Sequence, residues 1–325
     1  MGTIERQESL HFHGVLDDKN ISGICVWNQI VLVVSDEVTK RGNIVQLFEP
    51  EGNDYRAKTQ GFVVLDSPGS EVAEMDLEGL AADGHTIFVL GSHSAKRKKV
   101  ESKNPSMNNR AALNSSPVAQ PARDVLFKFD LDPAGNAGAI ERTSLREFLS
   151  ATEPFKSFGI IASKENGIDA EGLAVLDRKL YIGFRGPVLR ENFTPVIRCE
   201  FGTPIQSPVV LYVNLGGRGI RDLTNVGTGL LILAGPVGDG PESYQLYFWD
   251  GRDGVPGSDI PVSDLRKSLQ LIGDLPLPPS KSADEAPAKA EGITLIKETN
   301  HHWELLVVFD GLKDGHATRY RVEKP

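Results

Sequence analysis

Carboxylate side chains recur beside glycine at similar places along this chain. Glu78-Gly79, Glu171-Gly172 and Glu291-Gly292 each open a short apolar segment, and Asp76 and Asp169 stand two residues before the first two glutamates. Carboxylates brought together in this way can bind a divalent cation, hold a charged ligand or transfer protons. Their chemistry therefore depends on whether the fold gathers them at one place.

The segments around these glutamates are internal repeats. Residues 76–82 (DLEGLAA) and 169–175 (DAEGLAV) align, and each precedes a tight turn and a more apolar segment. Weaker copies begin at Ser22 and Arg221, and a further copy begins at Glu291. A short strand, a turn with Gly, Asp or Asn, and a second strand form the pattern of a β-hairpin. Five such copies predict an all-β protein, a single five-bladed β-propeller of four-stranded antiparallel blades.

The repeats also predict the domain organisation. We expect one propeller domain over residues 8–325, with blades at about 20–66, 76–162, 169–215, 220–273 and 290–322. Residues 8–14 precede the first copy, so we expect them to pair as the outer strand of the last blade and close the ring. Residues 95–123 are polar and rich in Asn, Ser and Pro, which predicts a long loop inserted in blade two.

Blade geometry decides which side chains can meet. The first strand of a blade lines the central channel and the second runs antiparallel to it, so the start of one and the end of the other share a face. At this channel mouth we expect Asp36, Glu37, Asp76, Glu78, Ser92, His93, Asp169, Glu171, Arg185, Arg221, Glu291 and Asp310.

Two functional hypotheses follow from this mouth. In the first, Glu78, Asp169, Glu171 and Glu291 hold Ca²⁺ or Mg²⁺, which lowers the pKa of a bound water for hydrolysis of a small ester, lactone or phosphoester. The catalytic groups are then His93, which transfers protons, and Arg185, which holds an anionic group of the substrate. In the second, the arginines neutralise the glutamates directly, and the protein is a non-catalytic propeller that binds a ligand or a protein segment. A purely structural role for the Glu-Gly pairs also remains open.

The paired D-x-E-G-L segments, Gly91-Ser92-His93-Ser94 and Arg185-Gly186-Pro187 resemble a bacterial domain-of-unknown-function propeller family over most of the chain. The segments are more distantly similar to esterase-like phytase and gluconolactonase-type propellers. The latter resemblance implies a divalent ion in the channel that supports ester or lactone hydrolysis, with Glu78, Glu171 and Glu291 as the matching carboxylates. Arg221 departs from that pattern, because a metal site tolerates a cation poorly.

Composition limits the classes of partner. The chain has 325 residues and a formal net charge of −9, which argues against nucleic-acid binding. No apolar stretch approaches the roughly 18 residues of a membrane span. The two cysteines, Cys25 and Cys199, are far apart and suit a reducing compartment. We therefore expect a soluble cytoplasmic protein with a small-molecule ligand, whose identity and oligomeric state the sequence does not specify.

Overall fold

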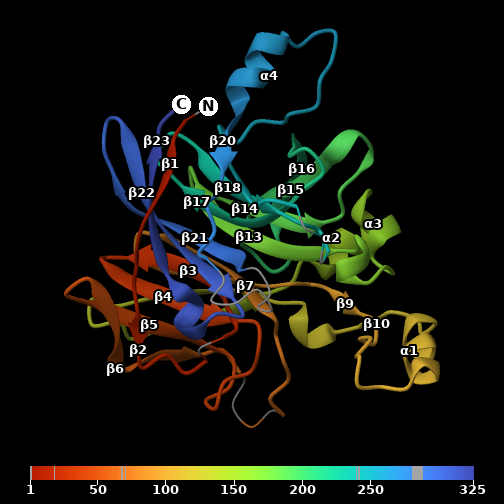
Figure 1. Cartoon of the computed structure of the whole chain (residues 1–325), viewed down its shortest axis with the longest axis horizontal. Helices are drawn as coiled ribbons and strands as arrows, with labels where there is room; N and C mark the ends of the chain where they lie inside the picture. The colour runs from red at the N-terminus through yellow and green to blue at the C-terminus, as the bar shows by residue number, and fades with distance from the viewer. Residues whose placement is uncertain are drawn as a thin grey trace.

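Five sheets surround a central axis in the computed structural model, which describes residues 2–17, 19–66, 69, 71–238, 240, 242–279 and 288–325 (Figure 1). The predicted five-bladed propeller is confirmed for these residues. The strands of each blade follow from the axis outward. Blade one contains β3 (Ile21–Trp27), β4 (Ile30–Ser35), β5 (Ile44–Glu51), β6 (Asp54–Val64) and β2 (Phe12–His13). Blade two contains β7 (Leu77–Asp83), β8 (Thr86–Gly91), β11 (Leu126–Asp130) and β12 (Glu141–Thr143).

The other three blades have four strands each within the described residues. Blade three contains β13 (Asp169–Leu176), β14 (Lys179–Gly186), β15 (Phe193–Glu200) and β16 (Gln206–Asn214). Blade four contains β17 (Gly219–Asn225), β18 (Leu230–Gly235), β19 (Gln245–Trp249) and β20 (Leu269–Asp274). Blade five contains β21 (Lys289–Glu298), β22 (His302–Asp310), β23 (Thr318–Glu323) and β1 (Ile4–Ser9).

The ring closes through both ends of the chain, whose termini lie close together in Figure 1. β1 pairs antiparallel with β23, so the N-terminal strand completes the last blade as expected. The closing strand begins earlier than the predicted range 8–14, however. Within that range Phe12 and His13 form β2, which joins blade one through a parallel pairing with β6. The range therefore serves two blades, because the chain crosses from one blade to the next at Leu10.

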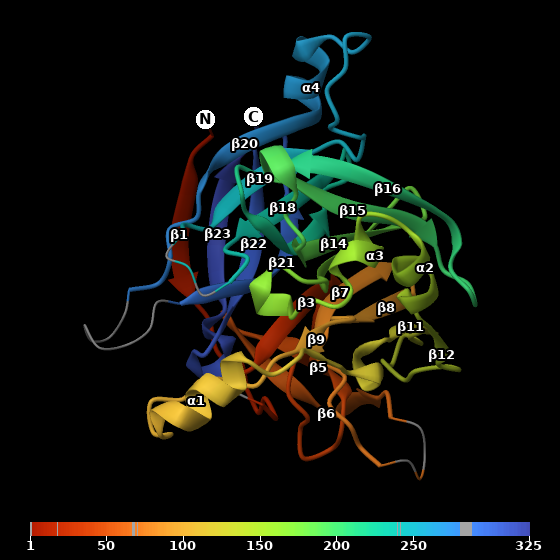
Figure 2. The same ribbon diagram turned by 90° about the vertical axis from the view of Figure 1, so that its right-hand side faces the viewer.

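The insertion in blade two is more ordered than a loop. Within residues 95–123 a short ribbon of β9 (Ala95–Lys96) and β10 (Val118–Ala119) carries helix α1 (Ser106–Leu113), which projects from the ring in Figure 2. After β12, blade two continues as α2 (Arg146–Ala151) and α3 (Phe155–Phe158), and α4 (Val262–Ser268) precedes β20. No helix of the described residues is long and apolar enough to cross a membrane.

The inner strands contact one another in the order β3, β7, β13, β17, β21 and back to β3, which encloses the axis. Each of them has a β-bulge at the same position. The extra residues of these bulges are Ser22, Glu78, Glu171, Arg221 and Glu291. A bulge redirects the side chain of its extra residue out of the regular alternation of the strand. The Glu-Gly repeat of the sequence is therefore the signature of this bulge.

Glycine follows the bulged residue in four blades because the inner strands approach closely there. A Cβ atom on Gly23 would lie 2.6 Å from the carbonyl oxygen of Glu78 in the next blade, and one on Gly79 would lie 2.7 Å from the Cβ atom of Leu173. Real side chains do not accept such distances, so only glycine allows these blades to pack at this radius.

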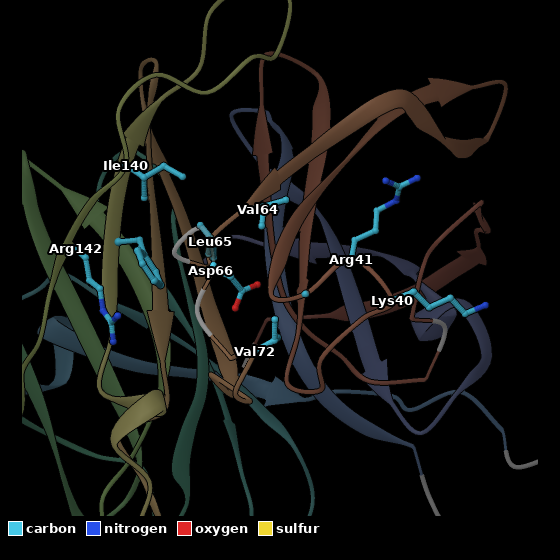
Figure 3. A pocket seen from close by; sticks show the side chains of 11 residues that line it. Lys40, Arg41, Val64, Leu65, Asp66, Val72, Ile140 and Arg142 are labelled. Atoms are coloured by element: carbon cyan, nitrogen blue, oxygen red, sulfur yellow. The ribbon is translucent and has the colours of Figure 1, made fainter.

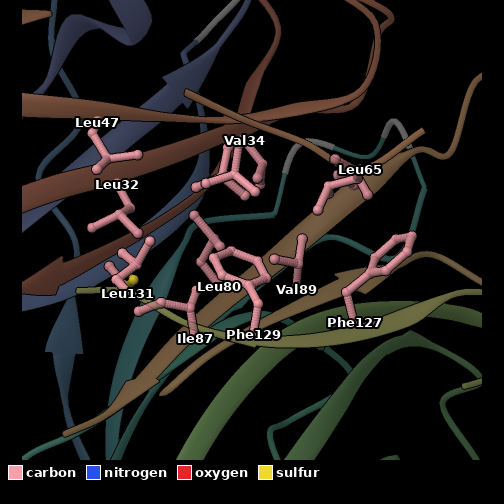
Figure 4. Packing of buried hydrophobic residues seen from close by; sticks show 14 of the residues in the cluster. Leu32, Val34, Leu47, Leu65, Leu80, Ile87, Val89, Phe127, Phe129 and Leu131 are labelled. Atoms are coloured by element: carbon pink, nitrogen blue, oxygen red, sulfur yellow. The ribbon is translucent and has the colours of Figure 1, made fainter. Parts of the chain in front are cut away.

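The apolar core lies between adjacent blades. Figure 4 shows blade one meeting blade two through buried side chains that include Leu32, Val34, Leu80, Val89 and Phe129. Similar clusters fill the other contacts between blades. Sheets that bury both faces in this way hold the inner strands rigidly, and so fix the positions of the five bulges.

Candidate ligand-binding site at the channel mouth

The bulges bring charged side chains of three blades into direct contact. Arg221 of blade four pairs with Glu171 of blade three (Nε to Oε2, 3.1 Å) and with Glu291 of blade five. Arg185, at the end of β14, pairs with Glu171 (Nη1 to Oε1, 3.0 Å) and with Asp169. All five side chains are largely buried. Alternating charges over three blades therefore form one buried network.

This network uses most of the carboxylates that the sequence singled out. Burial raises the pKa of Glu171, and Arg185 and Arg221 oppose that rise. The balance leaves the pKa of Glu171 raised to about 7, so the arginines offset only part of the cost of burying its charge. The sequence hypothesis in which arginines neutralise the glutamates directly matches this geometry.

A second network lies beside the first, in blade two. Asp76 accepts hydrogen bonds from Ser92 and Arg123, and Ser94 bonds to Ser92 at 2.8 Å. Arg123 also pairs with Glu74. Arg123 lies at the end of the insertion, so this segment supplies a cation to the mouth. Sequence analysis did not identify Arg123, since nothing in the polar segment distinguishes it from a solvated residue.

Two of the less exposed carboxyl groups at the mouth, Glu78 and Asp36, have no ion-pair partner among the described residues. Burial raises the pKa of Glu78 well above its usual range, and the charges of Asp76, Glu171, Asp36 and Asp169 raise it further. Burial, followed by Asp76 and Asp310, raises the pKa of Asp36 to about 7. Its Oδ1 atom is buried without a hydrogen bond. Glu78 and Asp36 are therefore the groups at the mouth that remain free to interact with a ligand.

The other predicted mouth residues have more peripheral positions. Asp310 ends β22 and lies 3.6 Å from Lys289 (Oδ2 to Nζ). Its charge acts on Asp36, which places it near the free carboxyl groups. Glu37 acts on Asp36 in the same way but is exposed to solvent. Both residues add negative charge around the mouth without closing it.

His93 is the predicted residue whose proposed role does not fit its surroundings. The ring is buried, its Nδ1 atom lies 2.8 Å from the carbonyl oxygen of Gly91, and its Nε2 atom accepts a hydrogen bond from the amide of Leu145 at 3.0 Å. Arg146 also donates to the His93 carbonyl oxygen. Both ring nitrogens are occupied by backbone groups, so His93 has none left for a substrate. We therefore correct the predicted role of His93: it holds the start of α2 in place and does not act as a general base.

A pH-dependent stability is expected from this anchor. Burial lowers the pKa of His93 from 6.5 to about 4, so the unfolded chain binds this proton first as pH falls. Stability is then lost as pH falls below 6.5 and approaches 4. Between pH 7 and pH 5 the loss amounts to about 2 kcal/mol. Urea unfolding of wild type and His93→Gln at both pH values measures it. Equal pH dependence in the two proteins would show that His93 does not titrate in this way.

Asp222 is a buried residue that sequence analysis overlooked. It stands where the other blades have glycine, and its side chain accepts hydrogen bonds from the amides of Leu223 (2.7 Å) and of Ile293 in blade five (2.8 Å). Burial raises its pKa well above the usual range, and these bonds to backbone amides oppose the rise. Asp222 therefore fastens blade four to blade five directly beneath the charged network.

The four residues predicted to hold Ca²⁺ or Mg²⁺ do not fit such an ion. Asp169, Glu171 and Glu291 are bonded to guanidinium groups, which leaves only Glu78 without a cationic partner. Among the described residues, no group of three or more His, Cys, Asp or Glu side chains is arranged to hold a metal ion. A divalent ion would have to displace both arginines, and a guanidinium beside a metal is strongly repelled.

Comparison with protein families agrees with the resemblance seen in the repeats. The family described as "Protein of unknown function (DUF3616)" matches residues 20–322. The chain belongs to the DUF3616 family. The match begins just before β3 and ends within β23, so all five inner strands of this DUF3616 protein lie inside it. No curated protein sequence matches the chain.

Solved structures similar to this DUF3616 protein include a hypothetical protein from Leishmania major, with 12% identity, a TM-score of 0.46, and coverage of 99% of this chain and 91% of that chain. A mutant of the GH43 protein BlXynB from Bacillus licheniformis has 12% identity and a TM-score of 0.49, over 90% of this chain and 49% of that one. The exo-β-1,3-galactanase from Phanerochaete chrysosporium has 7% identity and a TM-score of 0.45, over 97% and 64%. The DUF3616 chain thus spans about half the length of the GH43 protein.

Proposed function

We propose that the protein binds a small organic cation at the channel mouth, and that Glu78 and Asp36 receive its charge. The observation that carries this proposal is that both carboxyl groups lack a cationic partner among the described residues, while Asp169, Glu171 and Glu291 beside them are paired with arginine. An ammonium group placed between Glu78 and Asp36 would supply the missing charge. The ion-paired network would hold the two groups in position without competing for the ligand.

The raised pKa values support a cationic ligand in particular. Asp36 keeps its proton up to a pKa of about 7 because burial and neighbouring carboxylates disfavour its charge. A bound cation favours the ionised form, so ligand binding releases this proton whenever the pH is below 7. Affinity therefore rises with pH across the neutral range, and the ionisation of Glu78, whose pKa is also raised, adds to this rise.

The proposal is tested by calorimetric titration with diaminobutane, using butanediol as a neutral probe of the same length. We expect the diamine to bind, and its affinity to rise by up to about tenfold from pH 6 to pH 7, where one proton is displaced. The diol is expected not to bind. Asp36→Asn and Glu78→Gln should each weaken diamine binding about tenfold.

Glu37→Gln is the matched control, because Glu37 is the exposed neighbour of Asp36 and its substitution removes one negative charge, as Asp36→Asn does. It should leave the affinity within about twofold. Equal binding of diol and diamine, or equal losses in the Glu37 and Asp36 variants, would contradict the proposal. Parallel titrations with Ca²⁺, Mg²⁺ and Mn²⁺ separate it from a metal site, which would give tighter binding of the metal than of the diamine.

A metal-free hydrolase is the second candidate, favoured by the raised pKa of Glu78 beside the arginine-bound Asp169. A protonated carboxyl next to ionised ones is a suitable general acid. Glu78 would protonate the leaving oxygen of a small ester, lactone or phosphoester, and ionised Asp36 would activate water. Release of phenol from its acetate and phosphate esters, whose unactivated leaving group needs the proton, is expected to be lost in Glu78→Gln and kept in Glu37→Gln. Turnover that survives in Glu78→Gln would exclude this role.

A further inference from the structure

A cavity of about 720 Å³ lies on the outer side of the ring, between the ends of blades one and two. The connection from β4 to β5 supplies Lys40 and Arg41, and β6 ends beside it at Val64. Ile140 and Arg142, just before and within β12, form the opposite side (Figure 3). The volume falls in the range of pockets that hold small molecules.

Three cationic groups of this cavity have no carboxylate partner in the described part of the chain. Arg41 lies over the ring of Phe62 with its guanidinium carbon 4.5 Å from the ring centroid, and Arg142 lies 5.8 Å from the centroid of Phe127. Among the described residues, Lys40 has no ion pair either. An aromatic ring supports the flat face of a guanidinium and leaves its N–H donors free. The arginines are thus held in place with their donors unused.

The single carboxylate of the lining is already engaged. Asp66 accepts hydrogen bonds from the backbone amide and the side-chain amide of Asn43, both at 2.7 Å. It therefore cannot neutralise three cations. Unpaired positive charge on both sides of one cavity, in a chain with a net charge of −9, attracts anions to that cavity.

Apolar side chains occupy the space between the cations. Val64, Val72 and Ile140 are 40%, 48% and 39% exposed, and all three line this cavity. Large apolar side chains exposed together on a soluble protein indicate a surface that binds something. The lining therefore combines free cationic donors with an apolar surface, and these favour different parts of one ligand.

We propose that this cavity binds a small amphipathic organic anion, with its acidic head on Arg41 and its hydrocarbon body on Val64, Val72 and Ile140, while Lys40 and Arg142 add positive charge on the two sides of the cavity. A carboxylate or phosphate head suits the forked donors of arginine. This site is separate from the channel mouth in place and opposite in charge, so neither proposal depends on the other.

Isothermal titration with octanoate, and with octanol as the neutral probe of equal length, tests the cavity. Octanoate should bind and octanol should bind at least tenfold more weakly. Arg41→Gln should lower octanoate affinity about tenfold, and Arg142→Gln, which acts across the cavity, should lower it by a smaller factor. Ile140→Asp should abolish it, because a charge then lies where the hydrocarbon packs. All three residues are on the surface, so unchanged melting temperatures establish that the variants remain folded.

Arg190→Gln is the matched control, since Arg190 is 94% exposed on blade three, far along the chain from the cavity. It should leave octanoate binding unchanged. Equal binding of octanol and octanoate would show that the cavity binds hydrocarbon without any contribution from its cationic side chains. Equal losses in the Arg190 and Arg41 variants would show non-specific attraction. Absence of octanoate binding at millimolar concentration would also overturn the proposal.

Discussion

Arg221→Met is expected to lower the free energy of unfolding by about 3–5 kcal/mol at pH 7, which is the usual effect of removing one partner of a buried ion pair. Arg221 is 4% exposed and is bonded to Glu171 and Glu291, which are 2% and 7% exposed. Met fills a similar volume, so the loss comes from charge and not from a cavity. Urea unfolding followed by tryptophan fluorescence measures it.

The pH dependence of this variant gives a second check. Burial already raises the pKa of Glu171 to about 7 in the folded protein, and loss of the opposing Arg221 charge raises it further and favours the protonated form of Glu291 as well. The folded state then binds more protons than the unfolded state, and the deficit shrinks as pH falls toward 5. Glu171→Gln and Glu291→Gln added to Arg221→Met should restore most of the stability. A deficit independent of pH, or no rescue, would mean that the loss reflects packing alone.

Asp36→Asn is expected to stabilise the protein at pH 8. Asp36 has a pKa of about 7 in the folded state against its usual 3.8, so the folded protein binds this proton more tightly than the unfolded chain does. The associated penalty is absent below pH 3.8, grows as pH rises, and is complete above 7. A shift of about 3 pKa units corresponds to about 4 kcal/mol, which asparagine would recover at pH 8.

Thermal and urea unfolding at pH 4 and pH 8 check this expectation. The gain in the free energy of unfolding of Asp36→Asn should be large at pH 8 and small at pH 4. Glu37→Gln should change the free energy of unfolding little at either pH. Asp36 is also a ligand-binding group in the proposed function, so the same variant is expected to be more stable and to bind diaminobutane less tightly. Groups that are positioned to bind a ligand commonly reduce the stability of the protein when the ligand is absent. A loss of stability at pH 8 would contradict the first expectation, and unchanged diaminobutane binding would contradict the second.

The repeat made the blades predictable because each blade reuses the same hairpin and the same close contact at glycine. Hairpin turns and apolar second strands are local patterns, so they survive in the weaker copies at Ser22 and Arg221. Strand β15 (Phe193–Glu200) was missed because it follows a short connection without a strong turn signal. The predicted range of blade two, 76–162, extends beyond its outer strand β12 and takes in α2 and α3.

It was easier to predict from the sequence which residues lie at the channel mouth than which of them form ion pairs with one another. Strand order alone places Glu78, Glu171, Arg221 and Glu291 at one end of the channel, and their mutual contacts follow from it. The bulge that directs these side chains is a feature of register, which the sequence does not show. His93 looked available because its partners, the carbonyl of Gly91 and the amide of Leu145, are backbone groups with no sequence signature.

The pairing of β1 with β23 has a bearing on how the molecule is assembled. Strand β1 precedes the other described strands of the ring in the chain and its partner β23 follows them, so the ring stays open until β23 has been synthesised. Until then both edges offer unpaired amides and carbonyls to other chains. Two copies that fold close together could exchange their β1 strands at this pairing and form a domain-swapped dimer. A high local concentration of nascent chains therefore favours misassembly of this protein.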